Sequence, residues 1–116
     1  MEHSINKVWR LAPALIMLAA AALIPLGSIA QTSPGENLFQ AKCASCHGAD
    51  GAGKTPMGTA LKLRDLRSQD VQNQSDAELT RIVAKGKNKM PAFDGKLKKD
   101  QIDQVVGYVR ELGKKR

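Results

Sequence analysis

Five consecutive residues, Cys43-Ala44-Ser45-Cys46-His47, carry the side chains best suited to cofactor chemistry. They read C-x-x-C-H, the pattern for covalent attachment of a c-type haem. The two thiols lie on one helical turn, so each can form a thioether to a vinyl group of the same porphyrin, and the imidazole that follows then lies beside the iron. A bare CxxC also serves as a thiol redox pair or as half of a zinc site. The rest of the chain has to decide among these uses.

The first thirty residues have the pattern of a secretory signal peptide. Lys7 and Arg10 give a positive start, residues 11–26 form an apolar run, and Ser28 and Ala30 are the small residues of a cleavage site. We expect cleavage after Ala30 and export to the periplasm or to the outer face of the cytoplasmic membrane. An uncleaved membrane anchor is the alternative. It is disfavoured because the apolar run is short for a membrane span and contains prolines.

Residues 31–116 are expected to form one small domain with too little apolar bulk for a core of its own. Their only aromatic side chains are Phe39, Phe93 and Tyr108, because the single Trp lies in the first thirty residues. Domains of this size usually need an additional stabilising element, such as disulfides, a metal or a cofactor. We therefore infer that a buried porphyrin fills the centre.

Helix signals in the mature chain predict an all-α domain of about three to five helices. Ser33 as N-cap, Pro34 at the first position and Glu36 in a capping box predict a helix over residues 34–46, which ends in the CxxCH motif. No convincing strand and no internal repeat is present.

Three further helical segments follow this first helix. Residues 69–74 are expected to form a helical turn. A second capping box at residues 75–78 predicts a helix that ends near Gly86. The last helix is expected over residues 99–112, where apolar side chains recur with a period of 3.6. They are Ile102, Val105, Val106, Val109 and Leu112.

Residues 48–67 are expected to be a loop because they are rich in glycine and contain a proline. Within them, residues 48–55 match the phosphate-binding loop pattern G-x-x-x-x-G-K-[ST]. That loop requires a buried strand before it and a helix after it. Here the CxxCH helix comes before it, so we expect no bound nucleotide, and no feature of the chain indicates nucleic-acid binding.

An alternation of leucines and cations follows the glycine-rich segment. Leu61, Leu63 and Leu66 are expected to lie in an extended segment along the porphyrin edge. Arg64 and Arg67 are candidates for pairing with a haem propionate, although a solvated cation is the more ordinary state of either side chain.

A second axial ligand for the iron has to come from a methionine, since the only other histidine, His3, lies in the signal segment. The candidates in the mature chain are Met57 and Met90. Met57 follows His47 so closely that the chain could hardly cross to the opposite haem face. Met90 comes after a helix, in a loop stiffened by Pro91, so we expect Met90 to be the ligand, with core filling as the alternative role.

Three separated motifs in this order resemble those of the small soluble class I c-type cytochromes of bacteria, which carry one haem. They are CASCHGADGAGKT, KMPAF and a terminal helix with VVGYVREL, and the resemblance covers roughly residues 33–113. It implies helices wrapped around one covalent haem c, with His47 and Met90 as axial ligands. It also implies that the carbonyl of Pro56 steadies the His47 ring.

The same resemblance implies that the first and last helices cross. Gly35 and Phe39 would then pack against Val105 and Tyr108, with Gly107 allowing the close approach. One departure from good helix design is visible, because Lys98 and Lys99 begin the last helix where a small capping residue would be better.

These features predict a one-electron carrier between redox proteins and not an enzyme, because two protein ligands leave the iron no open site. The formal net charge is +7, and it stays basic after loss of the first thirty residues. We expect Lys54, Lys85, Lys87 and Lys89 to steer docking onto an acidic partner surface. The alternatives are a haem-bearing subunit of a respiratory or dehydrogenase complex, which could be membrane-anchored, and a haem enzyme or gas sensor with a labile sixth ligand.

Overall fold

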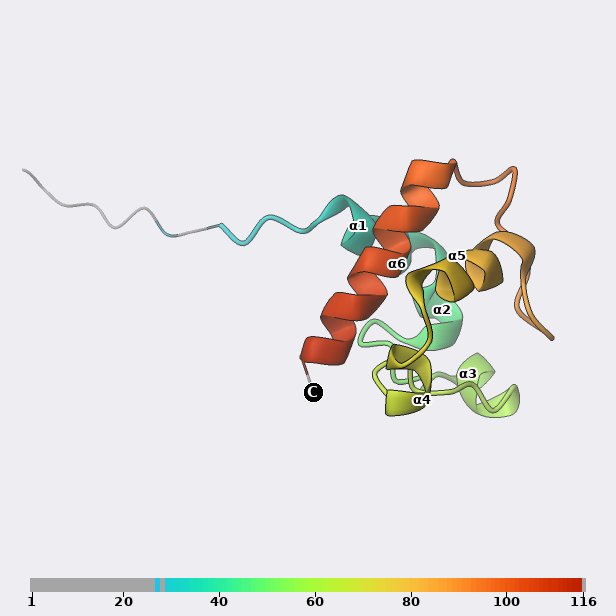
Figure 1. Ribbon diagram of the computed structural model, residues 1–116. Helices are drawn as coiled ribbons and strands as arrows, with labels where there is room; N and C mark the ends of the chain where they lie inside the picture. Colours follow the sequence, from blue (N-terminus) through green and yellow to red (C-terminus); the bar gives the residue numbers. More distant parts are fainter. Residues whose placement is uncertain (1–26, 28, 116) are drawn as a thin grey trace, which may run out of the picture.

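The computed structural model describes residue 27 and residues 29–115, whose arrangement is shown in Figure 1. Within that part the chain forms six helices, two isolated β-bridges and no strand, which confirms the predicted all-α class. The predicted signal peptide lies almost entirely outside the described residues, so its cleavage stays a prediction. The helices are α1 (Pro34–Lys42), α2 (Ala44–His47), α3 (Pro56–Ala60), α4 (Gln69–Gln72), α5 (Asp76–Lys85) and α6 (Lys99–Lys114).

Helix α1 begins as its sequence predicts. The Ser33 hydroxyl oxygen accepts a hydrogen bond from the backbone N–H of Glu36 at 3.1 Å, and Pro34 occupies the first turn. The Glu36 carboxylate does not close the expected capping box. It accepts a hydrogen bond from the Tyr108 hydroxyl at 3.3 Å, so it joins α1 to α6.

The predicted helix over residues 34–46 is interrupted at Cys43. The backbone there widens to φ −119°, and its N–H still donates to the Phe39 carbonyl at 2.8 Å. A separate short helix, α2, then carries Cys46 and His47, and Gly48 ends it at φ +80°.

The crossing of α1 and α6 is the main contact between helices, and Figure 1 shows the two passing over each other. The rings of Phe39 and Tyr108 lie 5.3 Å apart between centroids. A Cβ atom on Gly35 would come within 2.2 Å of the Gln104 carbonyl oxygen, so Gly35 is the residue that allows the close approach. The expectation for Gly107 is wrong, because Gly107 is exposed and a Cβ there would meet nothing within 4 Å.

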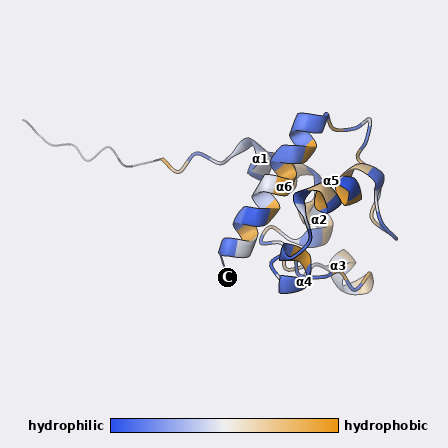
Figure 2. Ribbon diagram, in the orientation of Figure 1, coloured by the Kyte–Doolittle hydropathy of each residue, from blue (hydrophilic) through white to orange (hydrophobic). Residues whose placement is uncertain are grey.

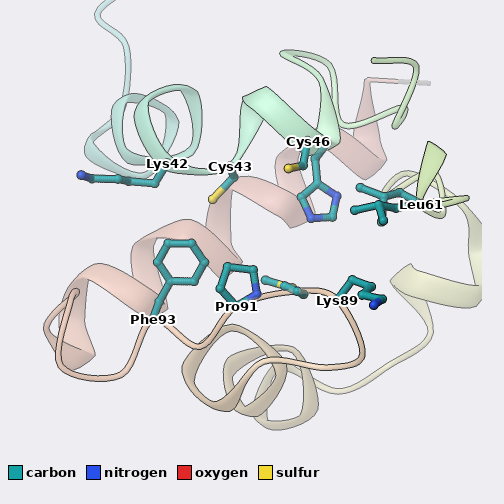
Figure 3. A pocket seen from close by; sticks show the side chains of 10 residues that line it. Lys42, Cys43, Cys46, Leu61, Lys89, Pro91 and Phe93 are labelled. Carbon is teal, nitrogen blue, oxygen red and sulfur yellow. The ribbon is translucent and has the colours of Figure 1, made fainter. Parts of the chain in front are cut away.

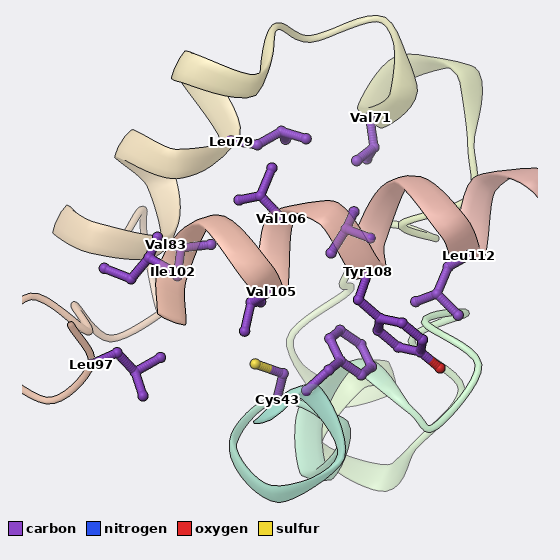
Figure 4. Close-up of a cluster of buried hydrophobic side chains, with 12 residues drawn as sticks. Cys43, Val71, Leu79, Val83, Leu97, Ile102, Val105, Val106, Tyr108 and Leu112 are labelled. Carbon is purple, nitrogen blue, oxygen red and sulfur yellow. The ribbon is translucent and has the colours of Figure 1, made fainter. Parts of the chain in front are cut away.

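Helix α6 supplies six of the twelve side chains in the buried hydrophobic cluster, which is drawn in Figure 4. Its apolar face points inward and its polar face outward, as the colours of Figure 2 show. At the N-terminus of the helix, the backbone N–H of Lys98 donates a hydrogen bond to the side-chain oxygen of Gln101, three residues later, at 2.8 Å. The other members of the cluster are Phe39, Cys43, Val71, Leu79, Val83 and Leu97.

The expected loop over residues 48–67 contains the unpredicted helix α3. Its N-cap is Thr55, whose hydroxyl oxygen accepts a hydrogen bond from the Gly58 N–H at 2.8 Å, and Pro56 stands at its first position. Thr followed by Pro is a helix-start signal, which the surrounding glycines obscure. The helix that precedes the phosphate-loop pattern is α2, and no strand precedes it in the described part of the chain.

The segment that contains α4 and α5 is fastened to α6 by polar contacts. The Arg110 guanidinium donates to the carboxylate of Asp76 and to the backbone carbonyl of Gln72, both at 2.8 Å. The Gln72 side-chain amide donates in turn to the carbonyls of Leu66 and Val109. Helix α5 begins at the predicted Ser75 cap and ends at Gly86, as expected. Among the described helices, none has the length and apolar character needed to cross a membrane.

Candidate functional site

A cleft of about 440 Å³ lies between the CxxCH segment and the segment that follows α5. Figure 3 shows Cys43 and Cys46 on one side of it, and Lys89 and Pro91 on the other. The cleft is lined mainly by apolar atoms. Its lining residues are Lys42, Cys43, Cys46, His47, Leu61, Leu63, Lys89, Met90, Pro91 and Phe93.

Two further hollows, of about 900 and 450 Å³, adjoin this cleft. His47 and Met90 line all three. The largest hollow opens toward Lys62, Arg64 and Asn88, whereas the third reaches the core side chains of α5 and α6. The two residues expected as axial ligands therefore border the same hollow space.

Both cysteines are free thiols, with Cys43 buried and Cys46 half-buried. Burial, together with a smaller effect of the neighbouring Cys46, raises the pKa of the Cys43 thiol to about 11. A thiol redox catalyst needs the opposite, a thiolate that is stable at neutral pH. The raised pKa of Cys43 therefore argues against a role in disulfide exchange.

The His47 backbone is fixed on both sides. Its N–H donates to the Cys43 carbonyl at 2.9 Å, and its carbonyl accepts from the Gly53 N–H at 2.7 Å. Burial lowers the pKa of the imidazole, so the ring is neutral and has a lone pair free for a metal. Its Nδ1 atom is buried and has no hydrogen-bond partner among the described residues.

The expected hydrogen bond between the His47 ring and the Pro56 carbonyl is not formed among the described residues, because the Nδ1 atom of the ring has no partner. Pro56 stands exposed at the start of α3 and is not among the residues that line the three hollows. The unsatisfied Nδ1 atom of His47 belongs to a ring that borders the cleft. A buried polar atom of this kind calls for a partner from outside the polypeptide.

Met90 ends a tight turn that begins directly after α5. Lys87 and Met90 exchange backbone hydrogen bonds of 2.9 and 3.3 Å, and Asn88 between them has φ +54°. A Cβ on Gly86 would come within 2.5 Å of the Met90 carbonyl oxygen, so the turn packs tightly on the helix end. The other candidate ligand, Met57, is 51% exposed on α3 and lines none of the three hollows.

The leucines and arginines of residues 61–67 have separate surroundings. Leu61 and Leu63 line the cleft beside His47, and Leu66 lines the inner hollow. The expected extended segment is wrong at its start, because Leu61 ends α3 with helical backbone angles and Lys62 has φ +52°. Arg64 lines the largest hollow.

The Arg67 guanidinium is engaged elsewhere. It donates to both carboxylate oxygens of Asp65 at 2.8 and 2.9 Å and lies 3.8 Å from Asp50. These hydrogen bonds hold the pKa of Asp65 at about 2. Arg67 lines none of the three hollows, which leaves Arg64 as the arginine next to the cleft.

The lysines expected at a docking surface also divide. Lys87 and Lys89 line the hollows. Lys85 is paired with Asp94 at 2.7 Å, and Lys54 is exposed beside α3 without lining them. The sequence interpretation missed Lys42, which lines the cleft, and Lys62, which lines the largest hollow. The position of Lys42 directly before Cys43 was the available signal.

Comparisons with known proteins agree with this site. The family model described as cytochrome c oxidase, cbb3-type, subunit III matches residues 30–109. Cytochrome c6 of Nostoc sp. (strain PCC 7120) is 37% identical over 109 residues, which covers 94% of each chain. The chain belongs to the class I c-type cytochromes. Cytochrome c6 of Anabaena variabilis is 41% identical to this cytochrome over 83 residues, covering 69% of this chain and 87% of the relative.

A solved structure supports the same fold. The KustC0563 c-type cytochrome matches this cytochrome with a TM-score of 0.63 and 29% identity, over 67% of this chain and 95% of that one. The cofactor of this cytochrome is one covalently attached haem c, and its function is to carry electrons between redox proteins. The donor set fits that cofactor. The cleft offers two thiols, a neutral imidazole with an unsatisfied buried nitrogen, and a thioether, within apolar walls.

Proposed function

We propose that this cytochrome holds its haem between His47 and Met90 and carries one electron at a time between two protein partners. The observation that supports this most strongly is that His47 and Met90, 43 positions apart in the sequence, border the same three hollows. Cys43 and Cys46 lie beside His47, where they would form the two thioethers.

Each residue has a defined task in this proposal. His47, through a ring nitrogen, and Met90, through its sulfur, would hold the iron of the haem. The haem supplies a one-electron Fe(III)/Fe(II) couple, and a His/Met pair of ligands raises its potential. The apolar walls, including Leu61 and Leu63, keep water from the iron. If His47 and Met90 both held the iron, no site on it would be left for a substrate, so we propose that the protein is not an enzyme.

Substitution of each methionine tests the ligand assignment. We expect Met90→Ala to remove the Met-to-iron charge-transfer band of the oxidised protein and to create an iron that binds CO. The matched variant Met57→Ala should keep the band, because Met57 is exposed on α3. Loss of the band in Met57→Ala but not in Met90→Ala would overturn the assignment.

The docking surface is proposed to be the basic rim of the cleft and of the largest hollow beside it. Lys42 and Lys89 line the cleft, and Lys62, Lys87 and Lys89 line the hollow. An acidic partner would be steered to this rim by long-range attraction that salt screens. Lys87→Glu should slow electron transfer to an acidic partner at low salt, whereas Lys114→Glu at the far end of α6 should change the rate little. Equal rates in both variants at low salt would contradict steering.

We also propose that the protein is exported and that its first thirty residues are removed after Ala30. The basis is the pattern of cations, apolar run and small residues in the sequence, together with the need to attach haem to Cys43 and Cys46. N-terminal sequencing of the exported protein tests this. A mature chain that begins at Gln31 supports it, and an intact N-terminus contradicts it.

A second candidate function is that of a haem-bearing subunit of a respiratory complex. It is favoured by one observation, the description of the matching family model as subunit III of a cbb3-type oxidase. Size-exclusion chromatography of a mild membrane extract and of the periplasmic fraction separates the two functions. A carrier elutes as a small free protein, and a subunit elutes with a large complex.

A further inference from the structure

The hydroxyl of Thr55 connects the haem-binding motif to helix α3. It donates a hydrogen bond of 2.7 Å to the carbonyl oxygen of Cys46 and accepts one of 2.8 Å from the Gly58 N–H. Thr55 therefore caps α3 and at the same time holds the last turn of α2. No motif of the sequence analysis assigned this role to it.

The neighbouring backbone is packed around the same point. A Cβ on Gly58 would lie 2.6 Å from the Cys46 carbonyl oxygen and 2.2 Å from that of Gly53. The Gly53 N–H donates to the His47 carbonyl at 2.7 Å. The carbonyls of Cys46 and His47, at the end of a helix of four residues, are thus both satisfied by residues 53–55.

A helix of four residues cannot hold its own geometry, since helix formation is cooperative and short helices are unstable in isolation. The position of the His47 ring then depends on the hydrogen bonds made at the two ends of α2. At the N-terminal end, the Cys43 carbonyl accepts from the His47 N–H. At the C-terminal end, the Gly53 N–H donates to the His47 carbonyl and the Thr55 hydroxyl donates to the Cys46 carbonyl.

We propose that Thr55 is a positioning residue for the axial ligand His47. Its hydroxyl fixes the Cys46 carbonyl, and through it the backbone that carries the imidazole. This inference rests on the proposed ligation of the iron by His47. Thr55 itself touches neither the iron nor the cleft, so its effect passes through α2.

Two substitutions separate the hydroxyl from the bulk of the side chain. Thr55→Val keeps the shape and removes both hydrogen bonds, whereas Thr55→Ser keeps the hydroxyl. Thr59→Val is the matched control, because Thr59 lies exposed on the same helix and its hydroxyl makes no hydrogen bond within the described residues.

The test is proton NMR of the oxidised holoprotein. In Thr55→Val we expect the hyperfine-shifted ring resonances of His47 to move. We also expect the Gly58 amide to exchange with solvent about tenfold faster, because it loses a part-buried hydrogen bond. Thr55→Ser and Thr59→Val should match the wild type in both. Unmoved His47 resonances in Thr55→Val would overturn the proposal, even if the variant were less stable.

A measurement on the wild type keeps the proposal testable if Thr55→Val fails to mature. The Thr55 hydroxyl proton should exchange slowly with water and show a nuclear Overhauser effect to the Gly58 amide. Its absence would overturn the proposal. His47→Ala tests the ligation separately, because a low-spin iron in that variant would refute His47 as a ligand whatever the Thr55 variants show.

Discussion

The close contact between α1 and α6 predicts that replacement by alanine lowers the free energy of unfolding at Gly35 and raises it at Gly107. At Gly35, an added methyl group would lie 2.2 Å from the Gln104 carbonyl oxygen and 3.3 Å from the Tyr108 Cβ. Backbone atoms cannot give way as a flexible side chain can, so the helices must separate. Overpacking of this kind costs about 1–3 kcal/mol, and the better helix propensity of alanine offsets less than about 1 kcal/mol of it.

Gly107 provides the matched control on α6. A Cβ there meets nothing within 4 Å, and the residue is exposed in the interior of the helix. Gly107→Ala should therefore gain the propensity difference alone and raise the free energy of unfolding by about 0.5–1 kcal/mol. Gly35→Ala should lower it by about 1 kcal/mol, from a central overpacking cost of about 2 kcal/mol less a propensity gain of about 1 kcal/mol.

Guanidinium chloride unfolding of the holoproteins, followed by far-UV circular dichroism, measures both effects. For a domain of this size, 1 kcal/mol corresponds to about 4–8 °C in Tm, so thermal unfolding gives a second readout. A Gly35→Ala protein as stable as Gly107→Ala would refute the close approach of α1 and α6. A strongly destabilised Gly107→Ala protein would place the critical glycine on the other helix.

Three further predictions concern the core, the ion pair and the Met90 turn. Phe39→Ala should lower the free energy of unfolding by about 3–5 kcal/mol, because Phe39 is fully buried at the helix crossing; a loss below about 1 kcal/mol by denaturant titration would contradict this. The hydrogen bonds from Arg67 lower the pKa of Asp65 to about 2, so the ionised pair stabilises the fold above about pH 4, the ordinary pKa range of the carboxyl. This stabilisation is lost as the pH falls toward 2. Asp65→Asn should flatten the pH dependence of Tm in that interval, and an unchanged profile would count against the pair. Gly86→Ala and Gly95→Ala both place alanine at a positive φ, but only the new methyl group at residue 86 would collide with the Met90 carbonyl. On heating, the Met-to-iron band should therefore disappear at a lower temperature in Gly86→Ala than in Gly95→Ala. Loss at the same temperature would contradict the packing of the turn.

The sequence was sufficient for those parts of the fold that depend on local signals. The Ser33 and Ser75 caps are both formed, because a hydroxyl and a nearby free N–H need only three residues of chain. The inward face of α6 is confirmed for the same reason, since burial follows the helical period. The CxxCH motif is equally local, and its haem is confirmed through the family.

Other features depend on contacts between distant residues. The hydrogen bond from the Tyr108 hydroxyl to Glu36 joins residues 72 positions apart, which no local pattern encodes. The pairing of Arg67 with Asp65 is an exception, because the two residues are only two positions apart and the sequence interpretation overlooked this nearby carboxylate. The helical period alone places Gly107 outside the crossing, because it lies roughly 200° around the helix from Val105 and thus on the opposite face.

The optical spectrum of the purified holoprotein, oxidised and reduced and then exposed to CO, tests the central claim most directly. If His47 and Met90 hold the haem, the spectrum will be low-spin in both states, with a Met-to-iron band in the oxidised state and no change with CO. A high-spin spectrum, or ready CO binding by the reduced protein, would show an open sixth position and would contradict the account.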